Sequence, residues 1–597
     1  YGDHRDLHRL IRRQRQMCIR DSLYIEGIAS SQEDTIEKEF GPPKNVVFTP
    51  EGKYTEAGRR YLEAKGAKES DLGVETLEKG EYVYIKRYRK GEKTISILPH
   101  LFKKLIIETH FPKSMRWGKD NFSFGRPIRY ITALLGKEVV EFELAGIKSS
   151  RKSRGHRYLY PKFIDIPSAF EYPKLLRKMR VIFDPEERRE KIKNQIQKII
   201  YQLNKKGCNA KLLPDDELLE ELTFLTEHPT VFIGEFDARY LSLPSFILKE
   251  CLREYQKHFA VVNKKGILPF FIGIRDGGKQ GLQNIIEGNK KVLHARFNDA
   301  QFFYQEDCEL PLEKKVSALK KVIVQEKLGS YYDKVKRLVQ LSEKVLGQLK
   351  IPEEVKRRVR RAAYLCKADL VTNIVREFPE LQGIAGKEYA LKSGEEPLVA
   401  KAIEEHRKPR FNGDNLPQSM EGALLAILDK IDTLTGAFWA GFIPSGSEDP
   451  WGLRREAQGV IEIILNKRLD LSLTNLIKTS MELYGNKPEA QKKLREFFNV
   501  RLVTFLKELG VAFDQINAVM KVGGDNIVDL FARAQALQNV AKSCTFKEEV
   551  IAIVRLLNIL KQARDWRVKI PCEVSKKYLI EKEEKKLYQR WRKIRGE

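Results

Sequence analysis

Residues 355–374 read VKRRVRRAAYLCKADLVTNI, and their apolar side chains recur at intervals of three and four residues. This spacing places the apolar side chains along one face of an α-helix and most of the basic side chains on the others. A loop rich in Gly and Pro follows. The stretch therefore predicts an amphipathic helix whose apolar stripe consists of Val355, Val359, Ala363, Cys366, Leu370 and Ile374.

The same helical period continues on both sides of this helix. Two series precede it, namely Val316, Leu319 and Ile323, and then Val335, Leu338, Val345 and Leu349. Helical spacing also dominates the sequence that follows, and a fresh set of helices starts near residues 466–471. The last segment, residues 561–597, contains 13 Lys or Arg and 6 Asp or Glu. We predict one helical domain over residues 311–470 and a second over 471–597 that ends in this basic tail.

The first half of the chain, residues 23–310, shows short strands among helices. The turn-like segment Arg89-Lys90-Gly91-Glu92 separates two strand-like runs, which is typical of a β-hairpin. Farther on, apolar residues alternate with glutamates, a pattern that predicts a strand with one buried face. The predicted strands are 82–85, 94–98, 140–144, 231–236 and 270–274. The expected fold class is α+β and multidomain, with a mixed α/β N-terminal half.

Composition narrows the class of protein. The 597 residues include 109 Lys or Arg and 82 Asp or Glu, a net charge of +27 that indicates a polyanionic partner. Hydrophobic residues make up 42% of the chain, enough for several folded domains. No apolar run approaches the 18 residues of a membrane span. The seven cysteines include no Cys-x-x-Cys pair, which favours a reduced, cytoplasmic protein.

Several catalytic signatures are absent from the sequence. It contains neither the G-x-x-x-x-G-K-[ST] nor the G-x-G-x-x-G phosphate-binding motif. It also lacks the H-E-x-x-H zinc motif and the G-x-S-x-G nucleophile motif, and its nine histidines are scattered. We therefore expect no catalytic residue, no metal and no cofactor on this chain.

Four ordered motifs identify a family. The first comprises Met115-Arg116-Trp117-Gly118, residues 124–130 and Ala133-Leu134-Leu135-Gly136, and the second is Ser153-Arg154-Gly155-His156-Arg157. The third joins residues 367–372 to 377–383, and the fourth joins 429–434 to 444–450. Together they resemble the beta subunit of bacterial tetrameric glycyl-tRNA synthetase, from about Leu23 to about Gln562. Residues 1–22 resemble translated sequencing-adapter DNA and are interpreted as an artefactual segment outside the family.

The resemblance implies a fold and a function. It implies a front half, residues 23–310, similar to the B3/B4 module of phenylalanyl-tRNA synthetase. Residues 311–470 would form a helical HD-like domain, and residues 471–597 a helical anticodon-binding domain that stops early. The chain would bind tRNA(Gly) and position it for an alpha subunit, which carries the catalytic core and uses ATP and Mg. Two alpha and two beta subunits are expected in the complex, and no association with a membrane is expected.

The candidate tRNA-binding residues are basic. Arg116, Arg126 and Arg129 interleave with aromatic residues, which suits RNA stacking but equally suits a core edge with exposed guanidinium groups. Arg454 and Arg455 follow Asp449-Pro450, which is interpreted as a helix N-cap and first helical position, and their first turn would also suit a phosphate. The remaining candidates are Arg154, His156 and Arg157, and, on the C-terminal helices, Arg501, Arg533 and Arg555.

Two other functions stay open at this point. Asp369, Asp429 and Asp432 occupy HD-like positions, but the chain has no His-Asp pair, so these positions are interpreted as degenerate and metal-free. A metal bound there would favour an HD-type metal phosphohydrolase. The other alternative is a non-catalytic RNA-binding protein that has no alpha partner. Editing is disfavoured, because glycine is the smallest amino acid and a site can reject larger ones by size.

Overall fold

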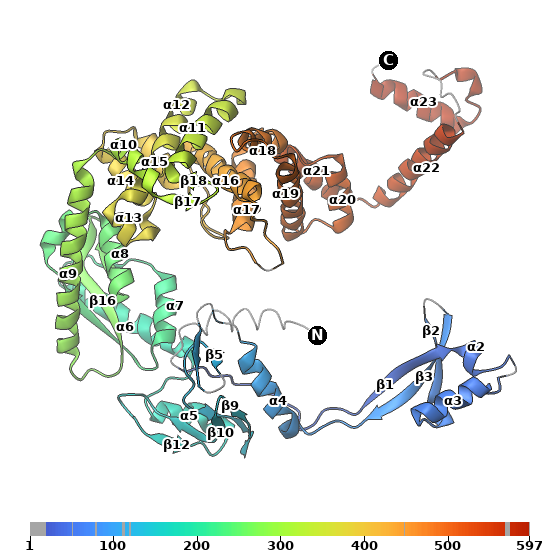
Figure 1. The fold of residues 1–597 in the computed structure, drawn as a ribbon, viewed down its shortest axis with the longest axis horizontal. Helices are drawn as coiled ribbons and strands as arrows, with labels where there is room; N and C mark the ends of the chain where they lie inside the picture. The colour runs from blue at the N-terminus through green and yellow to red at the C-terminus, as the bar shows by residue number, and fades with distance from the viewer. Residues whose placement is uncertain are drawn as a thin grey trace. The chain divides into compact units, whose positions relative to one another are not determined.

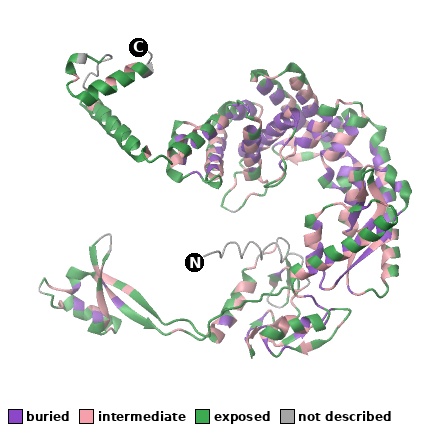
Figure 2. Ribbon diagram, turned by 180° about the vertical axis from the view of Figure 1, so that it is seen from behind, coloured by how far each residue is buried: buried purple, intermediate pink, exposed green. Residues whose placement is uncertain are grey.

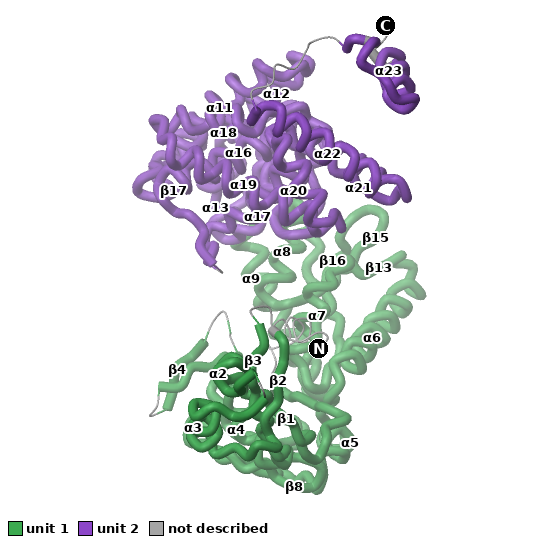
Figure 3. Tube along the Cα trace, turned by 90° about the vertical axis from the view of Figure 1, so that its right-hand side faces the viewer, with its two compact units in different colours: residues 1–302 green, residues 303–597 purple. Residues whose placement is uncertain are grey.

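The chain divides into two compact units, residues 1–302 and 303–597 (Figure 3). The computed structural model describes residues 20–50, 52–77, 80–109, 111, 114–118, 121–446, 448–566 and 574–595. The first unit mixes helices with several small sheets, and the second is almost entirely helical (Figure 1). The expected α+β class is thus confirmed in its coarse form.

The first unit begins with a three-stranded antiparallel sheet in the order β1-β3-β2. Val83 and Ile85 of the central strand are buried, and so is Val47 in the connection between β1 and β2. The hairpin predicted after residues 82–85 does not form, because its second strand is a helix. The elements here are β1 (Thr35–Pro43), α2 (Lys44–Val47), α3 (Glu56–Lys65), β2 (Leu72–Leu77) and β3 (Gly80–Arg89).

The prediction of a strand at residues 94–98 is wrong, since these residues begin helix α4 (Thr94–Ile107). Leu98 of this helix is buried in a cluster with Val140 and Phe142, and Ile95, Phe102 and Ile106 pack partly buried against it. The four helix residues follow one another at intervals of three and four, which is the helical period. A five-residue window was too short to distinguish this period from strand alternation.

The middle of the first unit consists of very short strands. The alternation predicted at residues 140–144 is present, because Val140, Phe142 and Leu144 are buried while Glu141 and Glu143 are exposed. Only its last two residues pair as a strand. The strands of this region are β4 (Met115–Trp117), β5 (Phe122–Phe124), β6 (Ile131–Thr132), β7 (Leu134–Leu135), β8 (Glu138–Val139), β9 (Glu143–Leu144), β10 (Ile147–Ser150), β11 (Lys152–Arg154) and β12 (Phe163–Asp165).

A four-stranded antiparallel sheet in the order β13-β15-β16-β14 forms the main core of this unit. The strand predicted at 231–236 is confirmed as β14 except for its last residue, the strand predicted at 270–274 is part of β16, and the two pair directly. Helix α6 packs on the sheet through Ile192 and Ile196. The elements are α5 (Tyr172–Lys178), α6 (Pro185–Lys205), β13 (Lys211–Leu212), α7 (Asp216–Leu225), β14 (Pro229–Glu235), α8 (Ser245–Gln256), β15 (Phe259–Asn263), β16 (Gly266–Asp276) and α9 (Leu282–Glu309), whose residues from 303 onward belong to the second unit.

His258, just before β15, is buried against two aromatic rings of the sheet. Its ring stacks on Phe271 with centroids 4.6 Å apart and meets the edge of Phe232 at 5.9 Å. Gly273 makes room for it, because a Cβ there would lie 2.8 Å from His258 Cδ2. Burial lowers the pKa of His258 to about 3, so the folded protein holds this imidazole neutral.

This burial predicts a pH dependence of stability. The unfolded state takes up a proton at His258 near pH 6.5 and the folded state does not, so the stabilisation is complete above pH 6.5 and declines as the pH falls toward 3. We expect the free energy of unfolding to fall by about 2 kcal/mol more between pH 7 and 5 in the wild type than in H258F. Urea unfolding of both proteins at each pH measures this difference, and equal pH dependence would contradict it.

The second unit is a helical assembly around α16 (Met420–Ala440), which is buried over most of its surface (Figure 2). Helices α11, α12, α15, α17, α18 and α19 pack against it. The helices of the unit up to residue 467 are α10 (Leu312–Lys315), α11 (Tyr331–Gln348), α12 (Glu353–Leu365), α13 (Asn373–Glu377), α14 (Ile384–Lys392), α15 (Pro397–Glu405), α16 and α17 (Leu453–Lys467). The three-residue strand β17 (Ile323–Gln325) and the two-residue strand β18 (Gly329–Ser330) form a small antiparallel sheet in this unit.

The long helix predicted over residues 355–374 is correct in its buried face but wrong in its continuity. Val359, Ala363, Cys366 and Ile374 are fully buried. However, α12 ends at Leu365, a 3₁₀ turn follows, and α13 starts after a new N-cap at Thr372, whose hydroxyl accepts the Val375 N–H. The predicted helix through Ile323 also stops early, because that residue belongs to β17 and is exposed.

The C-terminal part contains α18 (Leu473–Glu482), α19 (Pro488–Glu508), α20 (Phe513–Val522), α21 (Ile527–Val540), α22 (Phe546–Asp565) and α23 (Lys582–Arg595). Leu494, Phe498, Leu502 and Leu506 of α19 are buried at helical spacing. Helix α22 differs from the helices before it, since none of its residues is buried (Figure 2). No helix within the described ranges combines the length and the apolar character that crossing a membrane requires.

Candidate nucleic-acid interface

Three of the predicted tRNA-binding arginines lie exposed near one another in the sequence. Arg116 is on β4, and Arg126 and Arg129 are on the loop after its partner strand β5. Among the described residues, none of the three has an ion-pair or side-chain hydrogen-bond partner. Trp117 and Phe122, which face each other across the two strands, lie edge to face at 5.2 Å. Exposed guanidinium groups can bind phosphates and stack on bases.

The basic motif around β11 divides into exposed and buried members. Arg157 is exposed, with its guanidinium 5.4 Å from the Tyr158 ring. Arg154 is half-buried, with its guanidinium 5.9 Å from the Phe163 ring. Both can reach solvent. They remain candidates for tRNA contact.

His156 has a structural environment instead. It is fully buried, and its Nδ1 accepts the backbone N–H groups of Tyr158 and Leu159, each at 3.2 Å. The ring proton therefore resides on Nε2, which lies 3.1 Å from Oδ1 of Asp276. A side chain with no exposed surface cannot contact RNA without local unfolding, so we assign His156 to holding this loop. The sequence could not distinguish this role, since a lone His beside arginines fits both.

Arg20 is well anchored, although it belongs to the segment predicted to lie outside the fold. Its Nε lies 2.8 Å from Oε1 of Glu227, and its remaining nitrogens donate to Tyr130, Ser153 and the Arg154 carbonyl. Burial opposes its charge, but Glu227 outweighs that cost and raises the pKa of the guanidinium. The rest of the predicted segment, apart from Asp21 and Ser22, lies outside the described residues.

The predicted helix start at Asp449-Pro450 is displaced by three residues. Helix α17 begins at Leu453 and its N-cap is Gly452. The Asp449 carboxylate nevertheless accepts the N–H groups of Leu453 and Arg454, at 2.8 and 2.9 Å. Because this internal anion occupies these donors at the helix N-terminus, they are not free for a phosphate. Arg454 donates to the Gly446 carbonyl, whereas Arg455, also in the first turn of α17, is exposed.

The candidate arginines of the C-terminal helices differ in their contacts. Arg533 pairs with Asp529 and donates to the Val519 and Gly523 carbonyls, so it joins α21 to the end of α20. Arg501 lies partly buried over the Phe497 ring at 6.0 Å. Arg555 is exposed on α22. Of these three, Arg555 is the most accessible to RNA.

The predicted HD-like aspartates lie in the second unit, two of them on α16. A helix buried on all sides can carry charges only where partners neutralise them. Oδ2 of Asp429 lies 2.7 Å from Nζ of Lys367, and its Oδ1 lies 3.1 Å from Nζ of Lys334. Burial alone would raise the pKa of Asp429, but the two ammonium groups outweigh it and hold this pKa well below its ordinary value.

His406 completes the surroundings of Lys367. Its Nδ1 lies 2.6 Å from the Ile403 carbonyl, so Nδ1 carries the proton, and its Nε2 accepts from the Lys367 ammonium at 2.9 Å. Burial, and then the charge of Lys367, lower the pKa of His406 well below 6.5. The imidazole is therefore neutral, and the ammonium lies between a neutral nitrogen and a carboxylate.

Asp432 and Asp369 also have defined structural partners. Asp432 pairs with Nε of Arg337 at 3.0 Å and accepts a hydrogen bond from the Tyr484 hydroxyl at 3.0 Å. Asp369 Oδ2 accepts the N–H groups of Gly383 and Gly386 at 2.5 and 3.2 Å, so it caps the start of α14. Burial is the main reason that the pKa of Asp369 rises to about 6.

The three aspartates thus hold helices together in this unit. Lysine ammonium groups already neutralise Asp429, and the described residues contain no group of three or more His, Cys, Asp or Glu side chains suited to a metal. The sequence analysis missed Lys334, Lys367 and His406. The signal for Lys367 was its position between the apolar Cys366 and Ala368 on a buried stripe, which requires a paired charge.

Comparisons with known proteins place the chain in a family. A family model described as "Glycyl-tRNA synthetase beta subunit" matches residues 18–521. The glycine–tRNA ligase beta subunit of Halalkalibacterium halodurans is 39% identical over 552 residues, which cover 91% of this chain and 78% of that protein. Those of Halothermothrix orenii and Clostridioides difficile are each 37% identical, over 96% of this chain and 82% of each relative.

The family match begins at residue 18, so it includes Arg20, Asp21 and Ser22 of the segment interpreted as artefactual. It also includes every motif on which the resemblance was recognised. The match to the family model spans most of the chain, and the relatives exceed 30% identity over nine tenths of it. The chain therefore belongs to the glycyl-tRNA synthetase beta subunit family and acts in glycyl-tRNA synthesis as part of that ligase complex.

Proposed function

We propose that this chain binds tRNA(Gly) and holds its acceptor end against the active site of an alpha subunit. The observation that supports this most strongly is the exposure of Arg116, Arg126 and Arg129, which have no ion-pair partner among the described residues, on a chain with a net charge of +27. Contacts to the tRNA phosphates supply the affinity. The reaction becomes faster because the acceptor end of the tRNA is held close to the active site.

The chemistry belongs to the partner in this proposal. The alpha subunit binds glycine, ATP and Mg and forms the adenylate, and the complex contains two alpha and two beta subunits. The absence of a phosphate-binding motif from this sequence supports the division of labour. The family name itself supports a second kind of subunit.

Each part of the chain has a proposed role. Residues 23–310, as a B3/B4-like body, carry Arg116, Arg126 and Arg129. Residues 311–470, as an HD-like domain, serve as a scaffold, which the ion pairs of Asp429 and Asp432 support. Residues 471–597 form the anticodon-binding domain, in which Arg555 supplies a cation and unstacked bases supply specificity. Arg455, in the first turn of α17, supplies a further cation from the preceding domain.

Salt dependence of tRNA binding by the isolated chain tests this proposal. If Lys and Arg contact many phosphates, log K falls linearly with log salt, and affinity declines by on the order of 10³-fold or more between 50 and 200 mM salt. Fluorescence anisotropy with labelled tRNA(Gly) measures the affinity and its dependence on salt concentration. The chain alone should also show no glycine-dependent pyrophosphate exchange. Binding that does not change with salt, or exchange activity without the alpha subunit, would contradict the proposal.

A further inference from the structure

The β11–β12 hairpin and the strand before it, β10, are strongly basic. From Leu144 to Ile164 the chain contains six Lys or Arg and no Asp or Glu. None of these six cations has an ion-pair partner among the described residues. The exposed ones are Lys148, Lys152, Arg157 and Lys162. This part of the first unit therefore presents a positive surface that the described side chains do not neutralise.

The turn of this hairpin also presents an aromatic ring to solvent. Tyr158, in the turn, is 69% exposed, and Phe163, which pairs with Arg154 across the two strands, is 52% exposed. The Arg157 guanidinium lies 5.4 Å from the centre of the Tyr158 ring and leaves most of this side chain accessible. Exposed rings among cations are the combination by which proteins bind single-stranded nucleic acid.

Buried contacts hold the turn in one conformation. The Nδ1 atom of His156 accepts the backbone N–H groups of Tyr158 and Leu159, and its Nε2 faces Asp276. The turn is also closed by the Tyr160 N–H, which donates to the His156 carbonyl at 2.9 Å. Since the turn is ordered before any ligand binds, binding costs it little conformational entropy.

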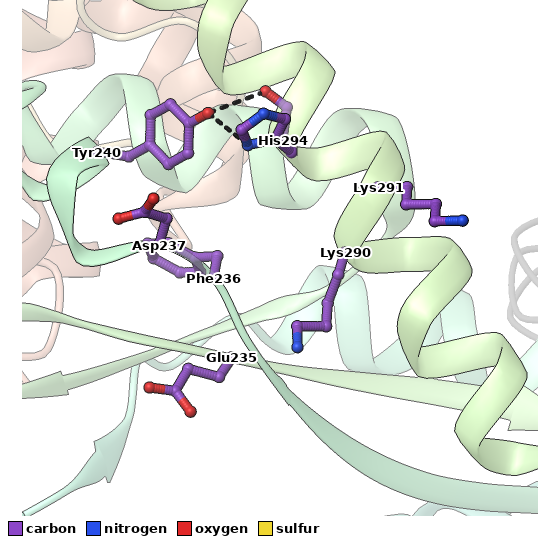
Figure 4. Close-up of a pocket in the computed structure, with 7 residues that line it drawn as sticks. All are labelled: Glu235, Phe236, Asp237, Tyr240, Lys290, Lys291 and His294. Atoms are coloured by element: carbon purple, nitrogen blue, oxygen red, sulfur yellow. Dashed lines mark hydrogen bonds between the residues drawn. The ribbon is translucent and has the colours of Figure 1, made fainter.

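The hollow between the end of β14 and helix α9 has the opposite character (Figure 4). Tyr240 has no exposed surface there, and Phe236 is only 6% exposed. Asp237 at its rim pairs with Arg239, whose guanidinium lies over the Tyr240 ring at 4.8 Å. This hollow therefore offers a base no ring to stack on, unlike the hairpin.

We infer that Tyr158 stacks on one unpaired base of tRNA(Gly), while Arg157 and Lys162 contact neighbouring phosphates. This inference deepens the proposed function and rests on it. The base is an unpaired one, because a base inside a double helix is already stacked on its neighbours. Every base has a π-face, so the hairpin holds a single-stranded part of the tRNA without reading its sequence.

The test separates stacking from charge. Y158A should weaken tRNA(Gly) binding at least about fivefold, because it removes the ring. Y158F keeps the ring and should bind within about twofold of the wild type, since the Tyr158 hydroxyl has no hydrogen-bond partner among the described residues. Neither variant removes a charge, so neither should change the slope of log K against log salt, whereas R157Q should lower that slope by about 1. Anisotropy titrations at several salt concentrations measure these values.

Tyr88 of β3 provides the matched control. It is 78% exposed, but the arginines on both sides of it pair with glutamates, Arg87 with Glu39 and Arg89 with Glu37. Y88A should therefore bind tRNA(Gly) as tightly as the wild type. A loss of affinity in Y88A as large as that in Y158A would overturn the inference, because any exposed tyrosine would then have the same effect.

Two further RNAs test the requirement for an unpaired base and identify its source. A fully double-stranded RNA should bind the wild type and Y158A equally, and a preference for the wild type as large as that of tRNA(Gly) would contradict stacking on an unpaired base. The second RNA is tRNA(Gly) without its unpaired 3′ nucleotides. If the difference between wild type and Y158A disappears with this RNA, the base belongs to the 3′ end. If the difference persists, the base belongs to a loop.

Failure of this inference can be distinguished from failure of the proposed function. A wild-type chain that does not bind tRNA(Gly) contradicts the proposed function. If the wild type binds, but Y158A binds equally tightly, or Y158F loses as much affinity as Y158A, only the stacking role of Tyr158 is overturned.

Discussion

The D429N variant is expected to lower the free energy of unfolding by about 3–5 kcal/mol, the cost of breaking a buried ion pair by removing one partner. Asp429 pairs with both Lys334 and Lys367, whose ammonium groups are buried, and Lys334 also lies 3.4 Å from Asp432, so Lys367 loses its carboxylate partner in this variant. Asparagine has nearly the same shape but no charge, so the loss reflects electrostatics rather than packing. Urea unfolding of the full chain, followed by circular dichroism, measures the change.

A surface pair provides the control for D429N. Glu482 pairs with Lys344 at 3.3 Å, and both side chains are more than 40% exposed. E482Q should change the free energy of unfolding by no more than about 1 kcal/mol, because solvent screens such pairs. Should D429N prove no more destabilising than E482Q, the buried cluster would not be the electrostatic core that its contacts indicate.

Replacing Arg116, Arg126 and Arg129, which have no ion-pair partner among the residues that the structure describes, is expected to have the largest effect on tRNA binding. The variant R116Q/R126Q/R129Q should weaken tRNA(Gly) binding by on the order of tenfold to a hundredfold, because each charge-assisted contact contributes more than a neutral one. It should also reduce the slope of log K against log salt by about 2–3, or about 1 for each lost phosphate contact. Anisotropy titrations at several salt concentrations give both values.

The matched control changes the same formal charge at paired arginines. Arg60, Arg87 and Arg89 are exposed on the three-stranded sheet and its helix, but each pairs with a glutamate. R60Q/R87Q/R89Q should retain most of the affinity and most of the salt slope. Equal losses of affinity in both triple variants would mean that the overall charge of the chain determines tRNA binding, and not the particular positions of Arg116, Arg126 and Arg129.

The sequence predicted helical and strand regions best where one period extended over many residues. The stripe from Val355 to Ile374 identified a buried face correctly, because burial depends on spacing alone. It did not reveal the break after Leu365, since the break depends on tertiary partners such as the hydrogen bonds from Gly383 and Gly386 to Asp369. The prediction of a strand at residues 94–98 was wrong for a related reason, because a window of five residues fits both the helical period and strand alternation.

The candidate site was predictable in residue type but not in exposure. Arg116 and His156 belong to similar basic, aromatic motifs, yet one is exposed and the other is fully buried. The difference arises from Asp276, which lies 120 residues after His156 in the sequence and faces its Nε2. Likewise, the N-terminus of α17 looked available for a phosphate until Asp449 was seen to occupy its N–H groups. Contacts between distant segments determined both outcomes.

Glycylation of tRNA(Gly) tests the central claim most directly. The reaction is measured with this chain alone, with a matching alpha subunit alone, and with the two mixed. The account predicts glycyl-tRNA formation in the mixture and none with this chain alone, with R116Q/R126Q/R129Q raising the tRNA concentration needed for half-maximal rate. Full activity of the alpha subunit alone, unchanged by adding a chain that binds tRNA(Gly), would contradict the positioning role.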